Sequence, residues 1–239
     1  MKLDLLAIAA HPDDVELTCG GTLIKMARRG RRVGILDLTE GEMGTRGSME
    51  IRRREAAAAA RILGAAHREN LGLPDARLEL RMDYKMALAQ RIRALRPHTV
   101  ILPYWEGRHP DHYTAAKLGY EACFLAGLKR LEMQGEAFRP FKILYATTYD
   151  RTVRPTFVVD ITREFSRRHR AILAYGSQFR PKPSERRSKV YIPLDRLAQQ
   201  VDLTARHYGE MVGVEFAEPF LCKEVMQVED VVDLPVRSV

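Results

Sequence analysis

Two short segments of the chain gather side chains that can bind a metal ion or move a proton. The first, at residues 11–14, reads His-Pro-Asp-Asp, and the second, at residues 109–112, reads His-Pro-Asp-His. Each follows a short apolar run that is typical of a buried β-strand. Imidazole and carboxylate groups are common ligands of catalytic zinc, which takes three protein ligands and lowers the pKa of its water to about 7. The two segments therefore predict a metal site, if the fold brings them together.

The residue types suggest a role for each side chain in such a site. Three of them would supply the metal ligands: His11, Asp14 and His112. Asp13 would remain beside the metal as a carboxylate that accepts a proton from the attacking water. His109 would stay protonated and stabilise an oxyanion or protonate a leaving amine, with Asp111 holding its tautomer. A single His-Pro-Asp-Asp segment is more typical of a helix cap, but two segments that each end a buried strand favour the metal site.

The elements that must position these side chains alternate along the chain. Apolar runs predict strands at 3–10, 32–39, 68–71, 99–103, 142–149 and 156–161. Amphipathic runs predict helices at 20–29, 49–63, 83–95, 114–131 and 163–175. This alternation predicts a single Rossmann-like, doubly wound α/β domain over residues 1–239, with a mostly parallel sheet flanked by helices. In such folds ligands bind at the carboxyl ends of the strands, where both His-Asp segments lie.

The last quarter of the chain differs from the rest in composition and in its pattern of apolar residues. Residues 176–193 are polar, basic and proline-bearing, which predicts an exposed loop. A helix is expected over 194–208, where Tyr208 is more typical of a core side chain than of an active-site phenol. Residues 213–239 are interpreted as a C-terminal tail, too short to be a separate domain.

Composition excludes several classes of protein. Hydrophobic residues make up 46% of the 239 residues and charged residues 29%, which excludes wholesale disorder. No apolar run approaches 18 residues, so no membrane-spanning helix is expected, and the N-terminal run is interpreted as a strand rather than a secretion signal. The three cysteines form no paired motif that would indicate a disulfide framework or a zinc knot. A cytoplasmic protein is predicted.

The net charge of +8 raises the question of an anionic partner. The basic residues are scattered over several segments without interleaved aromatic residues or a known module, so a nucleic-acid partner is not expected. A small anionic substrate remains compatible with this charge.

Longer motifs around both segments resemble the LmbE-like, or PIG-L, family of metal-dependent N-acetylglucosaminyl deacetylases. The resemblance rests on AHPDDVELTCGGT, TEGEMGTRGSMEIRRREAAAAARILG, NLGLPD and RHPDH, and it extends over nearly the whole chain. PYWEGRHPDH, FVVDIT, AYGSQF and GVEFAEPF are most similar to the bacillithiol-biosynthesis branch, which deacetylates N-acetyl-α-D-glucosaminyl L-malate. The resemblance implies a cytoplasmic, zinc-dependent hydrolase, with Fe²⁺ as an alternative metal, that forms a homo-oligomer, often a hexamer.

The same resemblance implies roles for individual residues. It implies the functions suggested above: His11, Asp14 and His112 bind the metal, Asp13 is the base, and His109 is a charged histidine oriented by Asp111. It adds Arg52 as a substrate contact, and Arg108 as an arginine suited to the malate carboxylates. Removal of the N-acetyl group of the malate conjugate, with release of acetate, is therefore the predicted reaction.

Two other interpretations remain open. The substrate could instead be another N-acetylglucosamine conjugate, such as an inositol conjugate or a chito-oligosaccharide, because the same ligand set serves all of them. A non-haem iron oxygenase also uses two histidines and one carboxylate, and the spacing of His11 and Asp13 suits its facial triad. Oxygenases of this type are usually β-rich, which the alternating pattern disfavours.

Overall fold

A computed structural model describes residues 1–150, 152–180 and 194–236 of the chain. Within them, seven strands form one sheet with the order β3-β2-β1-β4-β5-β7-β6. The strands are β1 (Leu5–Ala9), β2 (Val33–Thr39), β3 (His67–Leu73), β4 (Thr99–Pro103), β5 (Lys142–Ala146), β6 (Phe157–Asp160) and β7 (Ala217–Leu221). The first five pair in parallel, and β7 pairs antiparallel with both β5 and β6. The predicted single α/β domain with a mostly parallel sheet is confirmed.

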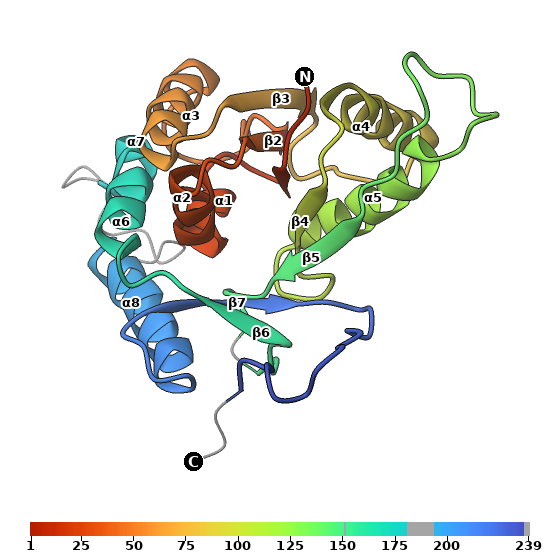
Figure 1. Cartoon of the computed structure of the whole chain (residues 1–239). Helices are drawn as coiled ribbons and strands as arrows, with labels where there is room; N and C mark the ends of the chain where they lie inside the picture. The colour runs from red at the N-terminus through yellow and green to blue at the C-terminus, as the bar shows by residue number, and fades with distance from the viewer. Residues whose placement is uncertain (151, 181–193, 237–239) are drawn as a thin grey trace.

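Helices cover both faces of this sheet (Figure 1). They are α1 (Asp14–Thr18), α2 (Gly20–Arg28), α3 (Met49–Leu63), α4 (Met82–Leu95), α5 (Pro110–Ala126), α6 (Phe165–Leu173), α7 (Gly176–Phe179) and α8 (Leu194–Glu210). Successive residues of β1 point to opposite faces. Leu6 and Ile8 pack in one core with α4 and α5, whereas Leu5 and Ala7 pack in a second core with α2, α3 and α6. Since both faces are covered, β1 is apolar throughout.

The ends of α3 and α5 show how local sequence sets an element. Helix α3 has the predicted bounds, because Ser48 accepts a hydrogen bond from the N–H of Ile51 and Gly64 ends the helix at a φ of 79°. Helix α5 begins at Pro110, four residues earlier than predicted, and ends at Ala126 rather than 131. The early start occurs because His109 caps this helix and Pro110 occupies its first turn.

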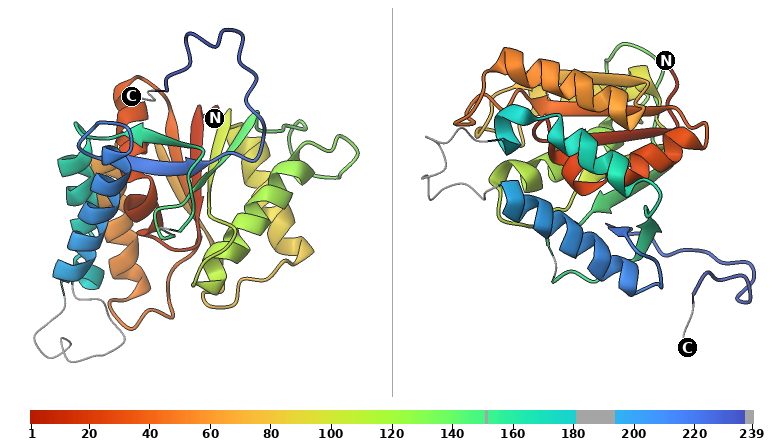
Figure 2. Two further views of the ribbon diagram at one scale, coloured as in Figure 1. Left: turned by 90° about the horizontal axis from the view of Figure 1, so that it is seen from below. Right: turned by 90° about the vertical axis from the view of Figure 1, so that its left-hand side faces the viewer.

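The last quarter of the chain is more regular than the sequence indicated. Residues 217–221 of the predicted tail form β7, which is inserted between β5 and β6. At the start of the predicted loop, residues 176–179 form the short helix α7; residues 181–193 of that loop lie outside the described part of the chain. Helix α8 packs beside β6 and β7 (Figure 2). Its Tyr208 is 1% exposed, which confirms the prediction of a core side chain.

None of the helices in the described ranges combines the length and the apolar character that crossing a bilayer requires.

Candidate active site

The candidate site lies at the carboxyl ends of the parallel strands, as predicted. His11, Asp13 and Asp14 follow β1, and the segment 109–112 follows β4. The loops after β2 and β3 contribute Gly41, Met43, Gly44, Asp75 and Ala76 to the cavity beside these residues. The parallel register of β1 with β2 and β4 places these loops at one edge of the sheet.

The three predicted metal ligands lie together. Their potential ligand atoms are all within 4.8 Å of one another. His11 Nδ1 lies 3.3 Å from Asp14 Oδ2, and His112 Nε2 lies 3.1 Å from Asp14 Oδ1. Two imidazole nitrogens and one carboxylate match the donor set of catalytic zinc, which keeps a further position for water or substrate. The geometry of these residues therefore fits a metal ion.

The backbone of the first loop explains why the neighbouring aspartates Asp13 and Asp14 make different contacts. Asp13 precedes α1 but makes no side-chain cap hydrogen bond, and its φ is 111°. Positive φ is uncommon for a residue other than glycine, and such strain is often found at functional sites. Asp14 instead accepts a hydrogen bond from the backbone N–H of His11 at 3.0 Å. Asp13 is therefore not serving as the helix cap that the sequence suggested as an alternative.

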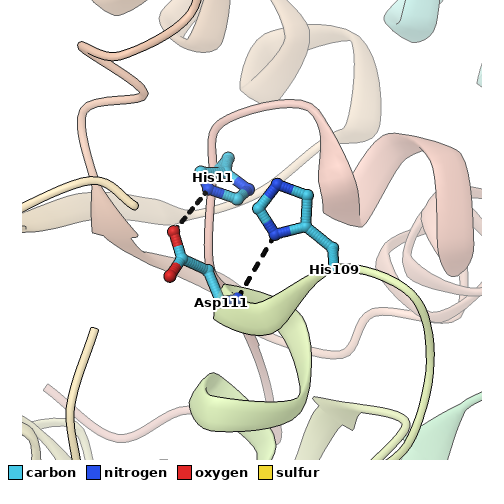
Figure 3. A group of neighbouring side chains, drawn as sticks. All are labelled: His11, His109 and Asp111. Atoms are coloured by element: carbon cyan, nitrogen blue, oxygen red, sulfur yellow. Dashed lines mark hydrogen bonds and ion pairs between the residues drawn. The ribbon is translucent and has the colours of Figure 1, made fainter. Parts of the chain in front are cut away.

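The second loop uses one histidine to start a helix and presents the other to the first loop. His109 Nδ1 accepts a hydrogen bond from the backbone N–H of Asp111 at 3.3 Å. The ring of His112 stacks on that of His109, with centroids 4.6 Å apart. The ring of His11 meets His109 edge-on at 5.0 Å. Figure 3 shows how His11, His109 and Asp111 converge.

Asp111 has a different partner from the one predicted. Its carboxylate does not hold His109: Oδ2 lies 3.3 Å from Nε2 of His11 and accepts a hydrogen bond from the N–H of Ala76 at 2.8 Å. The reason is local, since His109 turns its ring back onto the start of α5 while the side chain of Asp111 points toward the β1 loop. Asp75 Oδ1 lies 3.0 Å from the same His11 nitrogen. Two carboxylates therefore hold the side of His11 that faces away from Asp14.

The carboxylates around His11 control its charge. Burial lowers the pKa of His11. The hydrogen bonds with Asp111, Asp14 and Asp75 raise this pKa by more than burial lowers it, so the net value is well above the ordinary one. Burial raises the pKa of Asp75, and the contacts with His11 outweigh it and bring the value to about 2. This excess of carboxylates favours a cation at the site.

His109 also differs from expectation. Burial and the charges of His112 and His11 lower its pKa, whereas a protonated His109 was predicted. Because Nδ1 accepts a hydrogen bond, the proton of the neutral ring is on Nε2. A neutral His109 can still donate a hydrogen bond from Nε2 to a developing oxyanion.

Arg52 is enclosed rather than presented to solvent, although part of it lines the cavity. The residue is 7% exposed, and its Nη2 donates to Oε1 of Gln178 at 2.6 Å while Nη1 donates to the carbonyl of Pro12 at 3.2 Å. A Cβ atom at Gly41 would lie 2.8 Å from Nη1, and one at Gly44 would lie 3.0 Å from Nη2. The two glycines therefore form a slot for the guanidinium group.

Arg52 also acts on Asp13, because Nη1 lies 3.7 Å from Oδ2. Burial raises the pKa of Asp13 to about 7, even though the charge of Arg52 lowers it. A carboxylate with a pKa near neutrality is well suited to accept a proton and release it again.

The cavity beside these groups has a volume of about 270 Å³. Its lining includes His11, Asp13, Arg52, Asp75 and His109. Arg108 is exposed, is not part of this lining, and makes no hydrogen bond or ion pair with the residues that the structure describes. The two arginines expected to contact substrate are therefore in different environments.

Three residues of the site were missed from the sequence. Asp75 ends the NLGLPD motif, so its place after an expected strand was an available signal. Tyr149, in the loop after β5, donates a hydrogen bond to Asp14 Oδ1 at 3.2 Å. Gln178 reaches Arg52 across 126 positions of sequence. Gln178 lies in the AYGSQF motif, which contributed to the family resemblance but not to the predicted site, and Tyr149 is in none of the motifs that carry that resemblance.

The chain is similar to a known protein family and to several curated relatives. The family model described as GlcNAc-PI de-N-acetylase (PIG-L) matches residues 6–123. Diacetylchitobiose deacetylase from Thermococcus kodakarensis is 32% identical over 227 residues, which cover 90% of this chain and 80% of that protein. A probable N-acetyl-alpha-D-glucosaminyl L-malate deacetylase 2 from Bacillus anthracis is 26% identical over 198 residues, which cover 76% of this chain and 84% of the relative.

Among solved structures, the conserved protein TT1542 from Thermus thermophilus superposes with a TM-score of 0.86. It is 39% identical in sequence, and the match covers 95% of this chain and 98% of TT1542. The whole described domain therefore shares its fold with a solved structure.

Proposed function

Because this chain belongs to the PIG-L (LmbE-like) family of GlcNAc deacetylases, we propose that it hydrolyses the N-acetyl group of a GlcNAc-containing saccharide at a metal centre formed by His11, Asp14 and His112. The observation that carries the proposal is the grouping of these three residues, whose ligand atoms lie within 4.8 Å of one another, while His11 and Asp13 also line the adjoining cavity. The proposed metal is Zn²⁺, with Fe²⁺ as the alternative. In that site the ion supplies Lewis acidity toward the acetamide carbonyl and toward water.

The protein's own groups divide the remaining work. Asp13 accepts a proton from the attacking water and can return it to the glucosamine nitrogen as acetate leaves. Nε2–H of His109 donates a hydrogen bond to the oxygen of the acetyl group as that oxygen gains charge. Asp75 and Asp111 orient His11 by accepting from its Nε2, so that its Nδ1 remains on the side of Asp14. Arg52 limits the pKa of Asp13.

A chito-oligosaccharide, such as diacetylchitobiose, is the proposed substrate class. The relative at 32% identity is a diacetylchitobiose deacetylase, whereas the probable malate-conjugate deacetylase is 26% identical. The environments of the arginines support the same choice. The malate interpretation used Arg52 and Arg108 together, but both terminal nitrogens of Arg52 already have protein partners. Arg108 alone remains to meet an anionic group, so the bacillithiol assignment is retained only as the alternative.

The arrangement also argues against a non-haem iron oxygenase. Its triad would place Asp13 with the two histidines, but among the described residues the carboxylate grouped with His11 and His112 is that of Asp14. Asp13 faces Arg52 instead.

Acetate release distinguishes the substrates. The purified protein, with its metal content measured by elemental analysis, would be given diacetylchitobiose, GlcNAc-malate and GlcNAc-inositol at equal concentrations. We expect kcat/KM to be highest for diacetylchitobiose. A preference for the malate conjugate would restore the bacillithiol assignment, and no acetate from any of the three would contradict the deacetylase proposal.

Two further expectations remain predictions. A homo-oligomer, such as a hexamer, is expected from the family resemblance, and light scattering of the purified protein would measure its mass. A cytoplasmic location is expected from the same resemblance, and fractionation of cells that produce the protein would check it.

A further inference from the structure

We propose that Tyr149 is a positioning residue of the metal centre: its hydroxyl fixes Asp14 in the orientation that a metal ion requires. This inference rests on the proposed function, because it takes His11, Asp14 and His112 as the ligands. Tyr149 lies in the loop after β5, more than 130 residues from Asp14 in sequence, and its hydroxyl donates to Asp14 Oδ1 at 3.2 Å.

The contacts of Asp14 are paired in a way that supports this role. Oδ2 accepts from the backbone N–H of His11 at 3.0 Å and lies 3.3 Å from His11 Nδ1. Oδ1 accepts from the hydroxyl of Tyr149 at 3.2 Å and lies 3.1 Å from His112 Nε2. Each carboxylate oxygen of Asp14 therefore has two contacts. One is with a hydrogen-bond donor group that would not bind the metal, and the other is with an imidazole nitrogen of a proposed ligand. Tyr149 does for Oδ1 what the backbone N–H of His11 does for Oδ2.

The ring of Tyr149 adds a second contact with the ligand set. It stacks on the ring of His112 with centroids 5.3 Å apart and an interplanar angle of 16°. One side chain therefore touches two of the three proposed ligands. Partners of metal ligands hold ligand orientation in this way, and their loss typically weakens metal binding by about 10- to 100-fold.

The loop that carries Tyr149 is anchored to the same part of the fold as Asp14. The hydroxyl of Thr148 donates to the carbonyl of Thr18 at 2.7 Å, and the hydroxyl of Thr18 donates to the carbonyl of Asp14 at 2.7 Å. The N–H of Thr147 donates to the carbonyl of Pro219 in β7 at 3.2 Å. These bonds fix Tyr149 relative to α1 before any metal binds.

Tyr149 is on a different side of the ligands from the proposed substrate cavity. The 270 Å³ cavity is lined by His11, Asp13 and His109, whereas Tyr149 lines a separate space of about 20 Å³ together with Asp14 and His112. Tyr149 is 51% exposed and belongs to no core cluster of the described residues, so we expect removal of the hydroxyl alone to leave the core packing unchanged. This placement favours a role toward the metal ligand over direct contact with substrate.

The test compares Tyr149→Phe with the unaltered protein and with Tyr113→Phe, a control on α5 next to His112. Zn²⁺ affinity of the metal-free proteins would be measured by competition with a chromophoric chelator. The d–d absorption of the Co²⁺-loaded proteins would report the ligand geometry. We expect Tyr149→Phe to bind Zn²⁺ about 10-fold more weakly and to shift the Co²⁺ bands. Tyr113→Phe should match the unaltered protein in both measurements.

Activity at saturating Zn²⁺ separates positioning from catalysis. With the site filled, Tyr149→Phe should retain kcat within about threefold. A kcat loss of tenfold or more with unchanged Zn²⁺ affinity would overturn the proposal, since the hydroxyl would then act on substrate. Unchanged affinity and unchanged Co²⁺ bands would overturn it as well. If the unaltered protein bound no Zn²⁺ or Co²⁺, the metal centre of the proposed function would fail, which differs from a failure at Tyr149 alone.

Discussion

Arg52 Nη1 lies 3.7 Å from Asp13 Oδ2, so a buried cation stands beside the proposed base. Replacing Arg52 with glutamine removes this charge, and the pKa of Asp13, which burial already raises to about 7, should rise further. Asp13 accepts a proton only when it is ionised, so the acidic limb of the kcat/KM profile should move to higher pH, by about one unit or more. Acetate release measured between pH 5 and 9 checks this. Arg53→Gln, which loses an exposed ion pair with Glu40, should leave the limb in place.

Asp13→Asn tests the proton transfer itself. Among residues other than glycine, asparagine is one of those that best tolerate positive φ. The φ of 111° at position 13 should therefore be retained in this variant. The amide cannot accept the proton, and kcat should fall by about 100- to 10,000-fold. Zn²⁺ content per chain should stay the same as in the unaltered protein. Near-normal turnover would show that Asp13 is not the base.

Removal of the metal should destabilise the protein. An ion that binds only the folded chain stabilises it by about 2.7 kcal/mol at a concentration 100 times its Kd. Chelation should therefore lower Tm, and added Zn²⁺ should restore both Tm and activity. Asp14→Asn should lose this dependence, because one of the three ligands no longer carries charge. If the Tm of the unaltered protein changed neither with chelator nor with added Zn²⁺, that result would argue against a resident ion. Reconstitution with Fe²⁺ in parallel would identify the more active metal.

Glu218 in β7 should matter for stability although it does not line the cavity. Its carboxylate accepts hydrogen bonds from the N–H groups of Gly21 and Thr22 at 2.8 and 2.7 Å and lies 3.1 Å from Arg168 Nε. Among the described residues Glu218 is the only carboxylate at ion-pair distance from the buried Arg168, so Glu218→Gln should lower the free energy of unfolding by about 3 kcal/mol. Urea unfolding measures this. The control Glu215→Gln loses only an exposed contact with Arg206, which should cost less than about 1 kcal/mol.

The three cysteines should differ in reactivity. Burial raises the pKa of Cys19 and raises that of Cys123 to about 12, whereas Cys222 is partly exposed. The thiolate is the reactive form, so iodoacetamide at pH 8 should label one thiol per native chain and three after unfolding. Raising the pH to 9.5 should accelerate labelling at Cys222 alone. Mass spectrometry of digested protein locates the label, and modification of native Cys123 would contradict its burial.

Local signals in the sequence were sufficient for most of the fold. The bounds of α3 were predicted correctly because both ends carry residues with a physical preference, Ser48 at the cap and Gly64 at positive φ. The start of α5 was missed because histidine is not among the usual caps. Strand β7 was missed because Glu218 and Pro219 are unusual in a strand. Its burial depends on partners in α2 and α6 that no local pattern reveals.

In the site, too, some features follow from local sequence and others depend on the folded structure. The grouping of the proposed ligands was predictable, since each His-Asp segment is contiguous and follows a parallel strand. The partner of Asp111 was not, because it depends on which way the side chain turns in the first turn of α5. The contributions of Tyr149, in the loop after β5, and of Gln178, in α7, come from segments that are brought to the site only by the fold. Sequence pattern therefore indicated which residues come together as proposed ligands, while the groups that contact and orient them required the structure.

The pairing of Glu218 with α2 also bears on how the protein is made. A chain leaves the ribosome from its N-terminus, so the loop with His11 and Asp14 is synthesised first. The N–H groups of Gly21 and Thr22 at the start of α2, which follows that loop and α1, receive their carboxylate from a residue 196 or more positions later. The proposed metal site should thus reach its final form only after β7 has been synthesised. A nascent chain would be inactive until β7 is inserted into the sheet.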